Sequence, residues 1–402
     1  MAIIKPFKAF RPKTSLAKVI SSVPYDVVST QEAFNLTKGK PTNFLHVIRP
    51  EIDFPPETDI YDEKVYLKGK ENLAELLNSD SFVSEESESL YVYRITWKGL
   101  SQTGVFGCVS VKDYDHGIIL KHELTRPDKE DDRTKHILTQ QAHAEPVMLT
   151  FEGNSSISSL IEETTHSKPI FNFVTEDKVE HTIWKKKHYE ALVIAFSDIP
   201  SFYIADGHHR CASASRAAHE MERNNPNHTG KEAYNFFPAV LFPKNEVNIL
   251  AYNRVIHSIP IGFLEVLSSQ FTLHKNANPI PAKKGTLSLY LNGEWFGLEL
   301  PESSKNDSAS QLDVARLQEF ILEPLLNISN QRTDENINFV GGIRGFKELE
   351  KLVDSGEAEL GISMFPTSIE ELIKVSDDKL LMPPKSTWFE PKLRSGLLVH
   401  TF

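Results

Sequence analysis

The chain has 402 residues, 40% hydrophobic and 25% charged, which suffices for two or three domains with sizeable cores. Its formal net charge is −11 at pH 7. A field of this sign repels nucleic acid and anionic membranes, and no Lys/Arg-rich block offsets it. We therefore expect neither nucleic acid nor a membrane among its partners.

The N-terminal segment, the length of the apolar runs and the cysteine count all bear on the cell compartment of the protein. Basic residues interrupt the apolar stretches of Met1–Lys13, so this segment lacks the apolar run of a secretory signal. The longest later apolar run, Ala191–Phe196, is far shorter than the roughly 20 residues of a membrane span. The two cysteines, Cys108 and Cys211, form no CxxC motif, and so low a count fits a reducing compartment. We expect a cytoplasmic protein.

The first third of the chain predicts a β-hairpin followed by a helix. Leu90–Ile95 and Val105–Val111 are rich in β-formers, and Lys98–Thr103 between them fits a turn. Gly117–Leu120 ends in a further short strand. The polar stretch from about Lys129 to Gln141 is typical of a helix.

One face of this predicted helix concentrates charge. Lys129, Asp132, Arg133 and His136 recur at helical spacing and share that face. A solvated face is the commoner explanation for such a pattern. The alternative is that these residues contact a nucleotide or its acceptor.

The middle of the chain predicts a strand, a helix and a strand. Phe202–Ala205 is strand-like, His209–Arg223 is an Ala-rich helix, and Ala239–Phe242 is a strand introduced by Pro238. Polar stretches at 78–89, 224–231 and 301–311 fit surface loops.

Strands and helices alternate again near the end of the chain. The expected elements are the strand Ile337–Val340, the helix Phe346–Ser355 stopped by Gly356, the strand Ala358–Met364, and the helix Ser368–Val375 capped by Thr367 or Ser368. This alternation indicates an α/β or α+β fold. We expect a strand-rich region at 1–115, a catalytic core at 116–245 and an α/β lobe at 246–402.

The junction between the central strand and helix is the strongest candidate site. A strand that breaks at Asp206-Gly207 and opens a helix is suited to anions, because the first helical N–H groups lack intrahelical partners and the helix dipole is positive there. Gly207 has no Cβ and lets a phosphate approach the backbone. His208, His209 and Arg210 add cationic or hydrogen-bonding groups. Asp206 is suited to hold a metal ion or a substrate hydroxyl.

A structural interpretation competes with this one. Asp206 can cap the helix, Gly207 can serve the turn, and the histidines can be ordinary polar side chains. Neighbouring side chains on a helix diverge by about 100°, so His208 and His209 are poor joint ligands of one zinc ion.

The string Asp206–Arg210 resembles the signature of the free serine kinases of the ParB/sulfiredoxin-like superfamily. The whole chain also looks like a large bacterial and archaeal family related to those kinases, including Val23–Val28 and Met382–Thr387. Sulfiredoxins carry a catalytic Cys after the motif's Gly, and ParB proteins usually carry Glu. This chain has His208 there, as the kinases do.

Two further motifs carry the resemblance. His122-Glu123 is similar to the kinases' Pro-His-Glu, with Lys121 in place of Pro, and Pro384–Thr387 resembles their Pro-Lys-Thr-Thr. The resemblance implies that Glu123 is the catalytic base and that Lys385, Ser386 and Thr387 close over phosphates. On the residues alone, a solvated side chain at a strand end is the favoured interpretation of Glu123, and the resemblance reverses that preference. The long stretch before His122, including Asp26 in its Pro-Tyr-Asp context, is absent from the small kinases and predicts a different substrate pocket.

The resemblance implies a ParB/sulfiredoxin-like core with an N-terminal extension and a C-terminal α/β lobe. It implies a phosphotransferase that moves a phosphoryl group from ADP or ATP to a small-molecule hydroxyl, namely free L-serine. Glu123, Asp206 and His209 are then catalytic, Gly207, His208 and Arg210 bind phosphate, and Asp206 holds Mg²⁺. Two alternatives remain: a nucleotide-binding or nucleotide-hydrolysing regulatory protein without an acceptor, and a metal-dependent hydrolase.

Overall fold

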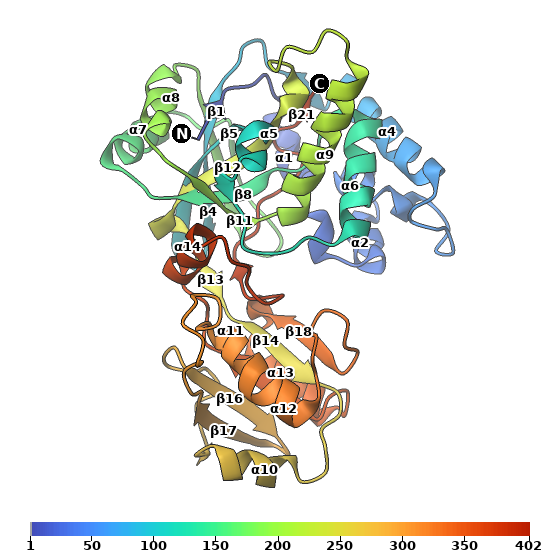
Figure 1. The fold of residues 1–402 in the computed structure, drawn as a ribbon. Helices are drawn as coiled ribbons and strands as arrows, with labels where there is room; N and C mark the ends of the chain where they lie inside the picture. The colour runs from blue at the N-terminus through green and yellow to red at the C-terminus, as the bar shows by residue number, and fades with distance from the viewer. Residues whose placement is uncertain (1) are drawn as a thin grey trace. The chain divides into compact units, whose positions relative to one another are not determined.

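The computed structural model describes residues 2–402, which form two compact units (Figure 1). Of the described residues, the first unit contains 2–121, 125–247 and 391–402, and the second contains 122–124 and 248–390. The expected segments 1–115 and 116–245 fall within the first unit except for His122–Leu124, and the expected segment 246–402 contributes to both units.

A nine-stranded mixed sheet forms the centre of the first unit, in the order β6-β11-β8-β12-β5-β4-β10-β9, with β1 also paired to β5. The pairs β6–β11 and β8–β12 are parallel, and the other pairs are antiparallel. The strands are β1 (Ile4–Lys5), β4 (Leu90–Trp97), β5 (Leu100–Ser110), β6 (Ile119–Leu120), β8 (Val147–Phe151), β9 (Phe171–Val174), β10 (Glu180–Lys186), β11 (Phe202–Asp206) and β12 (Phe236–Pro243).

The expected hairpin is β4–β5, and its turn is shorter than predicted. Lys98 and Gly99 both have positive φ, at 50° and 81°, which is the two-residue turn that matches the twist of paired strands. Trp97 therefore pairs directly with Leu100. Polar residues that suggested a loop, such as Gln102, lie buried inside β5.

Helices cover this sheet and pack on one another. α9 (His208–Asn224) packs on β8 and β12, α7 (Ser155–Thr165) packs on β4, β5 and β10, and α6 (Pro127–Gln140) packs along α9. The small residue Ser213 on α9 lies against α6, where its hydroxyl donates to the Glu130 carbonyl at 3.1 Å. The other helices of the unit are α1 (Ala17–Ile20), α2 (Thr30–Thr37), α3 (Leu45–Ile48), α4 (Glu63–Asn78), α5 (Val111–Asp115) and α8 (Glu190–Ser197).

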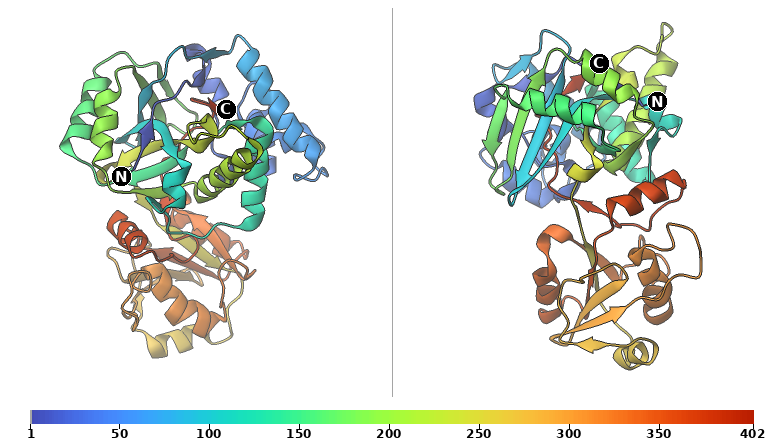
Figure 2. Two further views of the ribbon diagram at one scale, coloured as in Figure 1. Left: turned by 45° about the horizontal axis from the view of Figure 1, so that its top comes forward. Right: turned by 90° about the vertical axis from the view of Figure 1, so that its left-hand side faces the viewer.

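The N-terminal extension has its own apolar core, built around Phe44, Leu45 and Leu73. Its longest helix, α4, lies beside α6 (Figures 1 and 2). Two small sheets attach the extension and the chain end: β2 (Phe10–Pro12) with β3 (Phe82–Ser84), and β7 (Ala142–His143) with β21 (His400–Thr401). Part of the loop expected at 78–89 is thus the strand β3.

The second unit is built on a six-stranded antiparallel sheet in the order β15-β17-β16-β19-β14-β18. Its strands are β14 (Tyr252–Ile256), β15 (His274–Lys275), β16 (Thr286–Leu291), β17 (Glu294–Glu299), β18 (Ile337–Gly341) and β19 (Leu360–Met364), with β13 (Ile249–Leu250) paired separately to β20 (Trp388–Phe389). Its helices are α10 (Phe263–Gln270), α11 (Asp313–Leu317), α12 (Glu323–Leu326), α13 (Phe346–Asp354) and α14 (Ile369–Asp377).

The elements expected near the C-terminus are confirmed. Ser368 begins α14 with a capping box that includes Glu371, and Gly356 follows α13 with a φ of 78°. Gly341 ends β18 where a Cβ would lie 2.6 Å from the Trp388 ring. Close packing, rather than a turn, therefore explains that glycine. The molecule has a mixed α+β fold.

No helix within residues 2–402 combines the length and the apolar character needed to cross a bilayer.

Candidate functional site

The junction between β11 and α9 has the geometry that the sequence predicted. β11 lies between β6 and β8, and its register with β8 shifts between Ile204 and Asp206. Gly207 has a φ of 101° and ψ of 34°, and α9 begins at His208. A Cβ on Gly207 would lie 3.0 Å from Nε of Arg210. The glycine is therefore required by its left-handed backbone and by the arginine that folds back over it.

Asp206 is bound by two cations. Its Oδ2 accepts a hydrogen bond from Nη2 of Arg210 and its Oδ1 accepts one from Nζ of Lys392, both at 2.7 Å. Burial alone would raise the pKa of Asp206, but Lys392 and then Arg210 offset this and hold it well below its usual range. The carboxylate is therefore ionised and fixed in orientation.

This pairing bears on two expected roles of Asp206. Gly207 is the residue before α9, and no side chain caps the helix there, so Asp206 is not a helix cap. A divalent cation at its oxygens would meet Lys392 and Arg210 at short range, and like charges repel strongly in a buried site. Asp206 in this arrangement does not fit a Mg²⁺ ligand.

The two terminal guanidinium nitrogens of Arg210 are hydrogen-bonded to other groups of the protein. Its side chain is 7% exposed, and it also donates to the carbonyl of Pro146. Burial opposes its charge, but Asp26, Asp206 and Glu145 outweigh burial and raise its pKa. The arginine expected to grip a phosphate thus holds Asp206 and the segment before β8.

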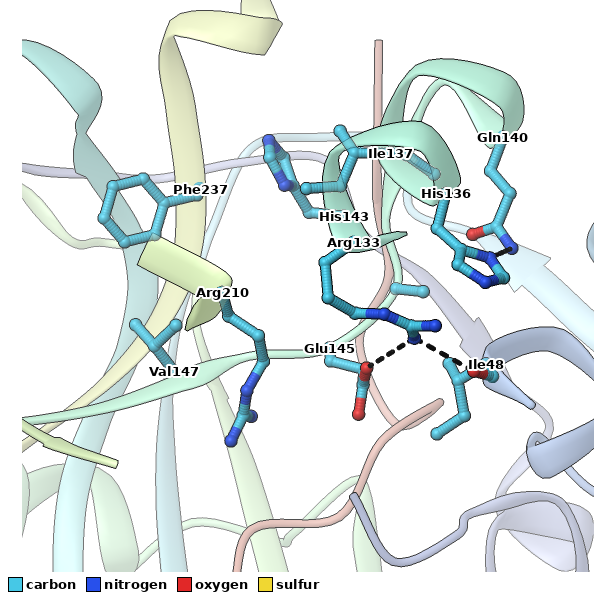
Figure 3. A pocket seen from close by; sticks show the side chains of 12 residues that line it. Ile48, Arg133, His136, Ile137, Gln140, His143, Glu145, Val147, Arg210 and Phe237 are labelled. Carbon is cyan, nitrogen blue, oxygen red and sulfur yellow. Dashed lines mark hydrogen bonds and ion pairs between the residues drawn. The ribbon is translucent and has the colours of Figure 1, made fainter. Parts of the chain in front are cut away.

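Beside Arg210 lies a small, partly open pocket of about 40 Å³. Figure 3 shows Glu145 at its wall, with Arg210 on one side and Arg133 on the other. Oε1 of Glu145 accepts a hydrogen bond from the Tyr25 backbone N–H at 3.0 Å, and Oε2 lies 4.0 Å from Nη1 of Arg133. Burial raises the pKa of Glu145, although Arg210 and Arg133 act in the opposite sense.

The charged face of α6 is buried, so its interpretation as a solvated face is wrong for Asp132 and Arg133. Both side chains are 9% exposed, and Nη2 of Arg133 lies 2.7 Å from Oδ2 of Asp132. Arg133 also donates to the Ile48 carbonyl at 3.0 Å and lies 4.2 Å from the centre of the Tyr25 ring. The N-terminal extension covers this face, and local spacing does not reveal such a cover.

The Pro-Tyr-Asp motif of the extension lies in the same charged cluster. Nη1 of Arg49 donates to the carbonyl of Tyr25 at 3.1 Å, which fixes the segment. Asp26 is exposed, and its charge acts on Arg210. The N-terminal extension therefore contributes directly to the surroundings of the candidate site.

The two histidines occupy different environments. His208 is buried, and its charge contributes to the low pKa of Asp206. Nε2 of His209 accepts a hydrogen bond from the backbone N–H of Arg126 at 3.0 Å, which places a neutral ring's proton on Nδ1. His209 thereby ties the first turn of α9 to the residue before α6.

The second unit carries the other two motifs. The backbone N–H of Met382 donates to the carbonyl of His122 at 2.8 Å, so His122-Glu123 adjoins the start of the Pro-Lys-Ser-Thr segment. His122 is buried, and burial lowers its pKa to about 3. Glu123 is half-buried. Its expected partnership with Asp206 stays a prediction.

The Pro384–Thr387 segment is held by its own backbone and neighbours. The Ser386 hydroxyl donates to the Pro383 carbonyl at 2.7 Å, and the Ser386 carbonyl accepts from the Thr367 hydroxyl at 2.9 Å. Nη2 of Arg254 donates to the Lys385 carbonyl at 3.2 Å. Ser386 thus has a structural role in this loop.

Sequence reasoning missed two members of the first unit's cluster, Glu145 and Lys392. Lys392 lies 186 positions beyond Asp206, and neither residue stands in a motif that distinguishes it from surface charges.

Comparisons with known proteins identify a family. Residues 4–315 match the family described as "Protein of unknown function (DUF1015)", and no curated protein matches the chain. Solved structures with a similar fold include a free serine kinase in complex with AMP, at 12% identity and a TM-score of 0.38 over 73% of this chain and 92% of that chain. A conserved hypothetical protein from Pyrococcus furiosus matches at 11% identity and 0.36, over 73% and 95%. SbnI from Staphylococcus aureus, truncated at its C-terminus, matches at 11% and 0.38, over 73% and 87%.

Proposed function

The chain belongs to the DUF1015 family, and we propose that within it this protein is a phosphotransferase that moves a phosphoryl group from ADP or ATP to a small-molecule hydroxyl. The proposed acceptor is free L-serine. The observation that carries the proposal is the β11–α9 junction, where a left-handed Gly207 opens a 17-residue helix beside the paired charges of Asp206.

The junction supports phosphate binding through backbone and charge. The first N–H groups of α9 point out of the helix end, and the helix dipole adds positive potential there. Lys392 and Arg210 place two cationic groups beside Asp206. The motif at this junction, Asp206–Arg210, is also the string that resembles the free serine kinases.

Glu123 is the proposed base for the acceptor hydroxyl. In phosphoryl transfer to an alcohol, a carboxylate can orient the hydroxyl in line and take its proton. Glu123 is half-buried and adjoins the Pro384–Thr387 loop through the His122–Met382 hydrogen bond.

Product formation tests the proposal directly. The purified full chain is incubated with ADP or ATP, MgCl₂ and isotopically labelled L-serine, and phosphoserine is measured by mass spectrometry. Mg²⁺ is included because it accompanies nucleotide phosphates as their counter-ion. Omitting serine and replacing it with threonine, homoserine or glycerol defines the acceptor.

Glu123→Gln is expected to lower turnover by about 10²–10⁴-fold, the usual contribution of general base catalysis, and to leave nucleotide affinity unchanged. Glu302→Gln, at an exposed glutamate of the second unit, is the matched control and should behave as wild type. Full activity in Glu123→Gln would remove it as the base. Nucleotide consumption without any phosphorylated acceptor would instead favour the regulatory alternative.

A further inference from the structure

The last segment of the chain, Pro391–Phe402, returns to the first unit and is called the C-terminal strap. Ser395 exchanges two backbone hydrogen bonds with Ser22, at 3.0 and 3.1 Å, and Val399 exchanges two with Phe10, at 2.8 and 3.0 Å. Beyond them, β21 pairs with β7 close to the chain end (Figure 1). The strap is therefore fixed along its length, as a segment must be to place a functional side chain.

The strap delivers a lysine to the candidate site. Nζ of Lys392 lies 2.7 Å from Oδ1 of Asp206, and the two side chains are 15% and 22% exposed. The ammonium of Lys392 is thus largely withdrawn from water and held against a carboxylate. Arg394, two residues along the strap, instead pairs at 2.8 Å with Asp177, whose side chain is 51% exposed. Only the first of these two cations reaches Asp206.

Asp206 is shared by two cations, Lys392 and Arg210. Asp26 and Glu145 also act on Arg210. Arg210 is further bound to the Pro146 carbonyl and is 7% exposed. Lys392 is the more accessible of the two cations, and it lies at the carboxylate that immediately precedes the N-terminus of α9.

We propose that Lys392 is a phosphate-binding residue: Asp206 holds its ammonium in the ligand-free protein, and a nucleotide phosphate oxygen takes over as its anionic partner on binding. The inference rests on the proposed function and deepens it. Asp206 is then a positioning residue for Lys392 rather than a metal ligand. No covalent bond forms or breaks in this exchange of partners.

Calorimetric titration with ADP, and separately with pyrophosphate, measures this role. Lys392→Met should raise the dissociation constant for both ligands by about 10–100-fold, the value of a charge-assisted hydrogen bond. Lys392→Arg keeps the charge and should recover most of the affinity. Arg394→Gln removes the neighbouring cation of the same strap and should leave the affinity unchanged.

A stability effect is separated from a binding effect by removing both partners. The double variant Asp206→Asn/Lys392→Met leaves no unpaired charge between them, so it should remain folded even where Lys392→Met does not. It should still bind ADP and pyrophosphate weakly. Wild-type affinity in a folded Lys392→Met protein or in the double variant would overturn the proposal.

The same titrations distinguish the inference from the function on which it rests. If the wild-type protein binds pyrophosphate through Lys392 but no nucleotide, the proposed function fails and the phosphate site stands. If it binds nucleotide equally with and without Lys392, the inference fails and the function stands. Failure to bind either ligand overturns both.

Discussion

Each unit buries two arginines, and one from each unit, Arg210 and Arg254, differ in what surrounds them. Arg210 in the first unit lies among Asp26, Asp206 and Glu145, which raise its pKa against the effect of burial. Arg254 in the second unit is fully buried, and its donors reach the carbonyls of Tyr252 and Lys385. Burial lowers the pKa of Arg254 to about 10.

The difference separates a structural arginine from one in a charged cluster. Among residues 2–402 no carboxylate forms an ion pair with Arg254, and its guanidinium lies 5.4 Å from the centre of the Phe339 ring. The two carbonyls and the Phe339 ring hold the guanidinium, and Arg254 in turn fixes the loop that contains Lys385. Arg210 instead holds ionised groups whose orientation matters, which is typical of functional sites.

The largest expected effects are the losses of unfolding free energy when each arginine is replaced. Their relative size tests the comparison. Arg210→Met leaves several carboxylates without their cation and should cost about 3–5 kcal/mol of unfolding free energy. Arg254→Met leaves only carbonyls unsatisfied and should cost about 1–3 kcal/mol.

Hydrogen exchange at α9 and at β14 reports the two units separately, so each loss can be assigned to its own unit. A larger loss at β14 in Arg254→Met than at α9 in Arg210→Met would contradict the comparison.

The next effect concerns pH. The pKa of folded Asp206 lies below its unfolded value, so its ionised form stabilises the protein above about pH 4, and this contribution is lost as the pH falls through the folded pKa. Asp206→Asn should cost about 2 kcal/mol at neutral pH. The difference in unfolding free energy between the variant and the wild type, measured by urea unfolding, should shrink below about pH 4. A difference that is constant down to strongly acidic pH would show that Asp206 is not held ionised by its partners.

Local patterns predicted the parts of the site that are local. The β-formers before Asp206, the glycine and the Ala-rich run specify a strand–turn–helix junction, and the structure has it at the expected residues. The partners of that junction come from elsewhere in the chain. Lys392 arrives by the C-terminal strap, and Asp26 of the N-terminal extension acts on Arg210. Long-range interactions of this kind leave no periodic trace in a single sequence.

The same limit explains the error on α6. Helical spacing correctly placed Asp132 and Arg133 on one face, but spacing does not say what covers that face. Tyr66 on α4 donates its hydroxyl to Oδ1 of Asp132 at 3.0 Å, and Tyr25 packs against Arg133. Burial was decided by another segment, which only the three-dimensional structure reveals.

The smallest predicted effect comes from replacing a glycine by alanine, and one glycine from each unit is compared. Gly207 and Gly356 both have positive φ, at 101° and 78°, but a Cβ on Gly207 would meet Arg210 whereas one on Gly356 would meet open space. Gly356→Ala should therefore cost only the backbone strain, about 1–2 kcal/mol. Gly207→Ala should cost the same strain and also displace the guanidinium from Asp206, which weakens pyrophosphate binding.

Thermal unfolding together with pyrophosphate titration separates the two contributions. Gly356→Ala should lower the melting temperature and leave the affinity intact, because its strain is confined to the turn after α13. Equal affinity in Gly207→Ala and Gly356→Ala would mean that the position of Arg210 over Gly207 does not matter for phosphate. The charged cluster of the first unit would then be a structural feature, as Arg254 is, and the contrast between the two arginines would lie in stability alone.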